Sequence, residues 1–272
     1  MNLESSPSPL RAKLEKLARW GVMASALSGL LPAELVAQEN LPHTTVAERV
    51  EKLELATLDA EIEQEVGHET VERLQGMRPR AMPAPERASA ADIPIIGFEK
   101  KPKIARALRD ELRRMPEAVV AAVKEIRYDS RRMALPARYG ITQDNVEAAH
   151  TDPSYREIVF SAGSDIYGPI LSAEALDHEA CHMVSPEVDE RLSPAERTRA
   201  YVDILRRVKA PDRFHSAYVE SIASNDPQDR MKAKADEYWA ETCGAFLRHD
   251  KLLPAADMKM VASVLDKLSS AR

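Results

Sequence analysis

The chain has 272 residues, of which 44% are hydrophobic and 30% are charged, as in a globular protein of one or two domains. Only nine glycines and four phenylalanines occur, a composition that favours helices. The net charge of −6 does not suggest a nucleic-acid partner, and two cysteines are too few for a disulfide framework.

The first segment, residues 1–43, is expected to be disordered or to serve in targeting. Within residues 11–37, basic side chains precede an apolar stretch from Trp20 to Leu31, which is the layout of an export signal. Glu15 and Glu34 weaken that interpretation, so an amphipathic helix or a non-cleaved secretion signal stays open. No stretch is long enough to predict a membrane span.

Residues 44–76 are predicted to form a charged helical region, and residues 77–94 a linker rich in proline and alanine. Apolar residues recur near helical spacing between glutamates, at Val46, Val50, Leu53, Leu58, Ile62 and Val66. The segment His68-Glu69-Thr70-Val71-Glu72 lacks the second histidine of a zinc motif and is interpreted as a solvated face. We expect residues 1–94 to be separable from a domain that covers residues 95–272.

Helix caps and prolines predict most of the helices and strands after residue 100. Residues 101–127 are predicted to form one helix or two, with Pro116 opening the second. Residues 155–160 are predicted to form a strand, which could be a cleft edge where an extended substrate pairs by β-addition. Ser193-Pro194-Ala195-Glu196 predicts the start of a helix that runs to about Val208. Further helices are expected at 232–249 and 254–270.

The sequence His178-Glu179-Ala180-Cys181-His182 matches the HExxH zinc motif. We predict a helix here, with Ser172 as its N-cap and Ser185-Pro186 at its end. The two histidines then lie one turn apart on one face, so that both imidazoles can bind one zinc ion. Glu179 can serve as a general base that takes a proton from zinc-bound water.

A catalytic zinc site needs a third protein ligand and an open position. Ser185 and Pro186 exclude the two common extensions of the motif that require glycine or histidine there. His215 and His249 stay possible, without a supporting motif. Glu237 is the favoured ligand, because Glu241 lies one turn further on the same helix face. Glu241 can then accept the free ring N–H of a ligand histidine.

The HExxH motif together with Glu237-Tyr238-Trp239-Ala240-Glu241 resembles the catalytic domain of the anthrax-lethal-factor-like zinc peptidases. That family carries HExxH and a downstream helix of the form E-aromatic-aromatic-A-E. The resemblance covers roughly residues 95–255 and implies an α+β, helix-rich, zincin-like fold, with a small mixed sheet beside the active-site helix. It also implies one Zn²⁺ per chain, bound by His178, His182 and Glu237. Glu179 would then be the general base, and Glu241 would contact a ligand histidine without binding the zinc.

The family also places a tyrosine ahead of the glutamate helix, where its hydroxyl can stabilise an oxyanion. At the family's spacing this chain has Arg230 instead. Tyr218 is the nearest substitute, and His215 is an alternative for the same role.

The two cysteines, Cys181 and Cys243, each fall in one of the two predicted site helices. We interpret them as small buried residues, and a bond between them would be unexpected.

These observations predict a zinc-dependent endopeptidase that acts on a protein or peptide. By analogy with lethal-factor-like proteins, a secreted or translocated effector acting on a host protein is favoured, and a cytoplasmic protein is the alternative. Two other functions stay open. One is a non-catalytic, zinc-stabilised binding module, which would have no use for Glu179 as a base. The other is an amide hydrolase with a non-peptide substrate.

Overall fold

The computed structural model describes residues 46–76, 89–129, 149–152, 156–161 and 164–270. The predicted targeting segment and residues 77–88 of the predicted linker lie outside these ranges. The described part is rich in helices and has a small mixed sheet of four strands, which confirms this much of the predicted fold class. The helices are α2 (Val46–Val66), α3 (His68–Gly76), α4 (Pro102–Leu112), α5 (Glu117–Val120), α6 (Ser164–Met183), α7 (Pro194–Val208), α8 (Ala217–Ser221), α9 (Pro227–Leu247) and α10 (Ala255–Ser270).

The sheet has the order β1-β2-β4-β3, formed by β1 (Ile95–Ile96), β2 (Glu125–Tyr128), β3 (Ala149–Asp152) and β4 (Glu157–Phe160). β2 pairs in parallel with both β1 and β4, whereas β3 is antiparallel to β4. β4 matches the strand predicted at 155–160, but it lies between two neighbours and therefore cannot be the open edge of a cleft. Among the described strands, the edge position beside β4 belongs to β3.

The prediction of helix through residue 127 was wrong at its end, because residues 125–128 form β2. Ile126 is fully buried, while Arg127 next to it is exposed, which is the period-two pattern of a strand. Pairing with β1 and β4 on both sides fixes this segment as extended backbone. Pro116 does open a second helix, α5, but that helix has only four residues.

Helix α6 carries the HExxH sequence and ends at Met183, three residues before Pro186. It is kinked at Gly168, whose φ of 68° is left-handed and which precedes Pro169. Ser172 was predicted to be the N-cap, but it lies inside the helix. Its hydroxyl donates to the carbonyl oxygen of Gly168 at 2.7 Å, four residues back, and so supplies a hydrogen bond just after the kink.

Helix α7 begins and ends where its sequence predicts. Ser193 accepts a hydrogen bond from the backbone N–H of Glu196, and the Glu196 carboxylate accepts one from the backbone N–H of Ser193. This capping box precedes a helix that closes at Val208.

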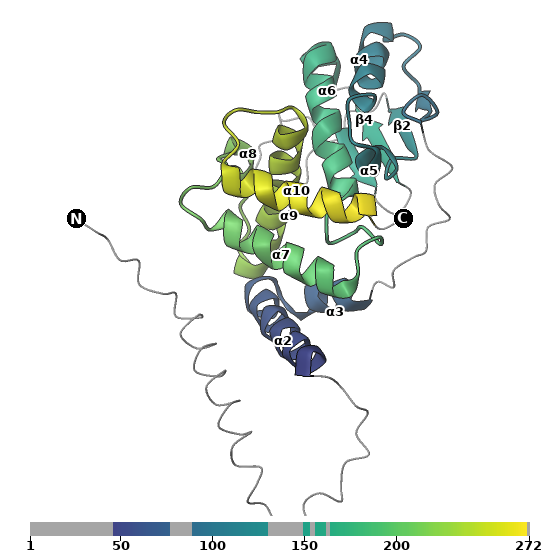
Figure 1. Cartoon of the computed structure of the whole chain (residues 1–272). Helices are drawn as coiled ribbons and strands as arrows, with labels where there is room; N and C mark the ends of the chain where they lie inside the picture. Colours follow the sequence, from purple (N-terminus) through teal and green to yellow (C-terminus); the bar gives the residue numbers. More distant parts are fainter. Residues whose placement is uncertain (1–45, 77–88, 130–148, 153–155, 162–163, 271–272) are drawn as a thin grey trace, which may run out of the picture. The chain divides into compact units, whose positions relative to one another are not determined.

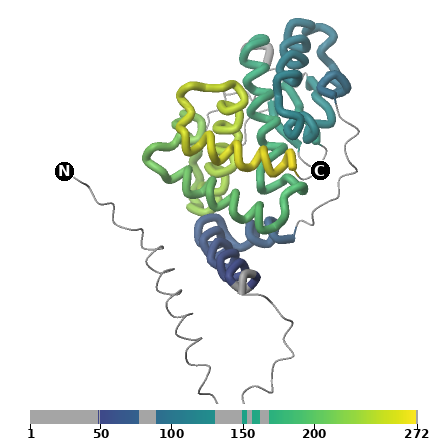
Figure 2. The backbone as a smooth tube through the Cα atoms, viewed as in Figure 1, coloured from purple at the N-terminus to yellow at the C-terminus, as the bar shows by residue number. Residues whose placement is uncertain are grey.

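Helix α6 is central to the described fold, since it contacts α4, α9, β3 and β4 (Figure 1). Leu176, Ala180 and Cys181 on its inner side are fully buried. Figure 2 follows the chain from the sheet through α6 to the C-terminal helices, of which α10 contacts α7 and α9. The HExxH residues are thus carried by an element that is packed on several sides.

Helices α2 and α3 meet at Gly67, whose φ is 89°. Ile62 and Leu74 are fully buried in the main core cluster, whereas Leu53 is 69% exposed. Of the predicted apolar stripe, Val50 and Leu53 are therefore exposed, whereas Leu58, Ile62 and Val66 are buried. The compact unit that holds the sheet and α6 extends from Glu51 to Arg272, so residues 51–76 pack as part of it. His68 and Glu72 are exposed, as expected of a solvated face.

Candidate metal centre

Three side chains from two helices converge at one point. His178 and His182 on α6 have their Nε2 atoms 3.1 Å apart. Oε2 of Glu237 on α9 lies 3.2 Å from Nε2 of His178 and 3.5 Å from Nε2 of His182. All three ligand atoms lie within 4.8 Å of one another, and the structure therefore forms a group that could hold a metal ion.

The chemistry of these donors fits a metal better than it fits hydrogen bonding within the group. Glu237 is 5% exposed, and its Oε2 is buried without a hydrogen bond of acceptable geometry. Two imidazole nitrogens that face each other cannot both be satisfied as acceptors, whereas one cation would satisfy all three atoms. The residues present thus suit a divalent ion.

The pKa values of the two histidines and of Glu237 depend on their burial and on one another. Burial lowers the pKa of His182, but Asp236 and Glu237 outweigh it and hold this pKa well above its ordinary value. Burial likewise lowers the pKa of His178, but the contact with the Glu237 carboxylate outweighs it, and the net shift is upward. Burial raises the pKa of Glu237, but both histidines lower it by more, to below its ordinary range. The three groups thus influence one another's pKa, as expected of donors that converge on one point.

A carboxylate stands behind each histidine. Oε1 of Glu241 lies 3.7 Å from Nδ1 of His178, on the side predicted from the i,i+4 spacing of the two glutamates. Oδ1 of Asp236 lies 3.3 Å from Nδ1 of His182. Asp236 was not predicted as a site residue, although it directly precedes Glu237. Such partners fix the tautomer of a ligand histidine and raise its basicity.

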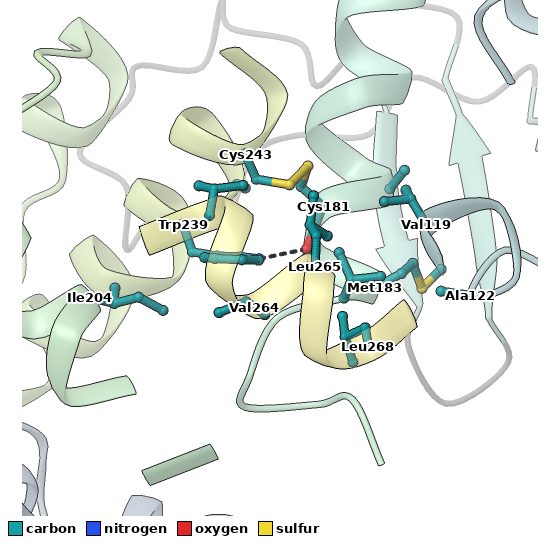
Figure 3. Close-up of a cluster of buried hydrophobic side chains, with 14 of the residues drawn as sticks. Val119, Ala122, Cys181, Met183, Ile204, Trp239, Cys243, Val264, Leu265 and Leu268 are labelled. Carbon is teal, nitrogen blue, oxygen red and sulfur yellow. Dashed lines mark hydrogen bonds between the residues drawn. A yellow bond between two sulfur atoms is a disulfide. The ribbon is translucent and has the colours of Figure 1, made fainter. Parts of the chain in front are cut away.

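The aromatic residues between the two glutamates of α9 hold that helix in place. The hydroxyl of Tyr238 donates to Oδ1 of Asp257 in α10 at 2.7 Å. Nε1–H of Trp239 donates to the carbonyl oxygen of Cys181 at 2.8 Å (Figure 3). Ala240 is fully buried. Glu237 and Glu241 are thus kept toward the histidines by neighbours that lock α9 against α6 and α10.

Cys181 and Cys243 form a disulfide between α6 and α9 (Figure 3). Both are fully buried, as expected, but the expectation that they are unbonded was wrong. They are 62 residues apart in sequence, and only the packing of the two helices brings their Cα atoms to 5.8 Å. The helices that carry the candidate ligands are therefore joined covalently at the level of the site.

The candidate base, Glu179, lies on α6 and contacts the sheet at β3. It is 9% exposed, and its Oε2 is 2.6 Å from the hydroxyl of Thr151 on β3. Neither β3 nor Thr151 was predicted, because residues 149–152 include a histidine and an aspartate and give no strong strand pattern.

The ring of Tyr218, on the short helix α8, lies edge-on to the ring of His178 with their centroids 6.3 Å apart. The hydroxyl of Ser216 accepts a hydrogen bond from the Val219 N–H and caps this helix. The other candidates lie elsewhere. His215 is exposed and lies 3.9 Å from Glu220, and His249 is also exposed, so neither joins the three-residue group.

No helix among the described ranges is both long and apolar enough to cross a membrane.

Comparisons of the chain with models of protein families, with curated proteins and with solved structures found no match. The family resemblance therefore stays a prediction that depends on the two motifs.

Proposed function

We propose that the protein is a zinc-dependent endopeptidase of the lethal-factor-like, zincin type. One observation carries the proposal: two histidines and a buried glutamate converge from α6 and α9, with a second glutamate, Glu179, beside the first histidine. A site that served only to stabilise the fold would need the ligands but not a nearly buried carboxylate next to them.

When bound, zinc would polarise a peptide carbonyl and lower the pKa of a water molecule. His178, His182 and Glu237 would hold it, and Asp236 and Glu241 would orient the two imidazoles. Glu179 would accept a proton from the attacking water and return it to the leaving amine. Tyr218, beside His178, would donate its hydroxyl hydrogen to the oxygen on which negative charge develops.

An extended substrate would pair with β3 rather than with β4. β4 already has a partner on each side, whereas among the described strands β3 has only β4. β3 also contacts α6, the helix that carries His178 and His182. The backbone of a bound peptide would add a fifth strand there, with hydrogen bonds that do not depend on its sequence. A protein substrate, and a role as a secreted effector acting on a host protein, are part of this proposal.

Metal analysis and a peptidase assay test the proposal together. Purified wild type should contain one zinc per chain and degrade casein, and Glu237→Ala should lose the metal. Glu179→Gln keeps the size of the side chain and the ligands, so it should retain zinc and lose turnover. Full activity of Glu179→Gln would contradict the mechanism.

The two alternatives give different results. A binding module would hold zinc and show no hydrolysis with casein or with a panel of model amides. An amide hydrolase would leave casein intact and would lose its activity on a model amide in the Glu179→Gln variant.

A further inference from the structure

Thr151 on β3 contacts the carboxylate of Glu179. Its Oγ1 lies 2.6 Å from Oε2 and 2.9 Å from the backbone carbonyl oxygen of the same glutamate. A hydroxyl has one hydrogen, so it can donate to only one of these acceptors at a time. The shorter distance is typical of an O–H···O⁻ bond, which makes the carboxylate the preferred acceptor when it is ionised.

The register of the sheet determines that a threonine occupies this position. In the antiparallel ladder Thr151 lies opposite Ile158, and Ala149 lies opposite Phe160. Because side chains alternate along a strand, Thr151 shares a face with the buried Ala149, and this strand contacts α6. A slip of one residue would bring His150 or Asp152 to the glutamate instead. Asp152 there would repel the carboxylate, whereas the hydroxyl can donate to it.

The contact also distinguishes the two oxygens of Glu179. Oε2 is bound by the hydroxyl, while no hydrogen-bond partner of Oε1 is found in the described part of the chain. Because Glu179 is only 9% exposed, little water can replace the hydroxyl as a partner. Within the described residues, the carboxylate is thus held at Oε2 alone.

We propose that Thr151 is a positioning residue for Glu179, an inference that rests on the proposed function. By holding Oε2 it fixes the rotation of the carboxylate, so that Oε1 is presented for proton transfer. The same strand that offers its edge to an extended substrate would thereby also aim the base.

The first test compares Thr151→Val, which keeps the shape and removes the hydroxyl, with Thr151→Ser, which keeps the hydroxyl. We expect kcat of Thr151→Val to fall about 10-fold, with KM and zinc content unchanged, as for other residues that orient a catalytic group. Thr151→Ser should restore most of kcat. Turnover of Thr151→Val within twofold of wild type would overturn the proposal, and so would a serine variant as slow as the valine variant.

The second test does not depend on turnover. Acetohydroxamic acid binds zinc through two oxygens and can give its hydroxyl proton to a neighbouring carboxylate, so its Kd reports on Glu179. The Kd is measured on zinc-loaded protein, and the Glu179→Gln variant shows how much affinity is lost when the carboxylate is absent. Thr151→Val should weaken acetohydroxamic acid binding about 10-fold. Thr151→Ser should bind it as wild type does. Equal affinity of wild type and Thr151→Val would overturn the proposal. Weakened binding in a protein that has no hydrolytic activity would reject the proposed function and retain the positioning role.

Discussion

Two helix interfaces of this molecule use charge in opposite ways. Where α2 and α3 pack on α7, partly exposed cations pair with acidic side chains: Arg206 lies 2.8 Å from Glu61 and Lys209 lies 2.7 Å from Glu65. Between α6 and α9, three carboxylates face two imidazoles. None of the ion pairs in the described part of the chain brings a lysine or arginine to those carboxylates.

The difference indicates what each interface is for. Balanced pairs at a partly exposed surface contribute little each, so the α3–α7 interface depends on buried leucine and on Arg197, which donates to the carbonyl oxygen of Leu74. The α6–α9 interface places a buried carboxylate, Glu237, among neighbours that include no lysine or arginine in the described ion pairs, and a bound cation would offset the cost of its burial. Variants at the first interface should change stability, and variants at the second should change metal binding.

The largest expected effect is the loss of a ligand. His182→Ala should lower zinc affinity about 1,000-fold or more, since three ligands share the free energy of binding. The unfolding free energy of the metal-free protein should change by only about 1 kcal/mol. Competition with a chelator and urea unfolding measure the two quantities. His68→Ala is the control, because His68 also precedes a glutamate, in α3, but lies in the exposed part of that helix.

At the α3–α7 interface, variants should lower the stability of the protein and leave its zinc affinity unchanged. Leu74→Ala should destabilise the protein by about 2–5 kcal/mol, because the side chain is fully buried. The folded fraction should still bind one zinc with unchanged affinity. Leu53→Ala, at a residue that is 69% exposed in α2, should stay within about 0.5 kcal/mol of wild type. Loss of zinc affinity in folded Leu74→Ala would mean that the N-terminal helices shape the site.

The disulfide tests whether the two interfaces are independent. Reduction with a phosphine, or the double change Cys181→Ala with Cys243→Ala, should lower stability by about 2–4 kcal/mol. Zinc affinity should fall as well, because the ligands are divided between the two helices that the bridge joins. A fall in stability with unchanged zinc affinity would show that packing alone aligns the ligands.

The smallest loss of zinc affinity is expected for variants of Asp236 and Glu241, the carboxylates that contact the Nδ1 atoms of the two histidines. Asp236→Asn keeps an acceptor for the Nδ1–H of His182 but removes the charge, and should weaken zinc binding about 10-fold. Glu241→Gln should have a smaller effect, because its carboxylate is 3.7 Å from Nδ1 of His178. Chelator competition again provides the affinities. A larger loss in Glu241→Gln would reverse the order of the two partners.

What the sequence predicted correctly is mostly local. The limits of α7 follow from a capping box within four residues, and the shared face of His178 and His182 follows from one helical turn. Glu237 was chosen because Glu241 follows it by one turn, and this choice again depends on a single helix.

What the sequence did not predict depends on contacts between distant segments. The Cys181–Cys243 bond requires α6 to meet α9, and β2 is a strand because it pairs with β1 and β4. Thr151 acquires its contact only through the register of β3. Ser172 has the residue type of an N-cap, but the chain is already helical before it.

The disulfide also constrains the path of the chain between the two helices that it joins. The bridge closes a covalent ring that runs from Cys181 through α7 and α8 to Cys243, and the ring includes both His182 and Glu237. A single cut in the exposed turn after Val208 would open the ring into two chain segments, and the disulfide would still join the segment that carries α6 to the segment that carries α9. Under the proposed function, such a cut made by another copy of the protein would leave His182 and Glu237 in the same molecule.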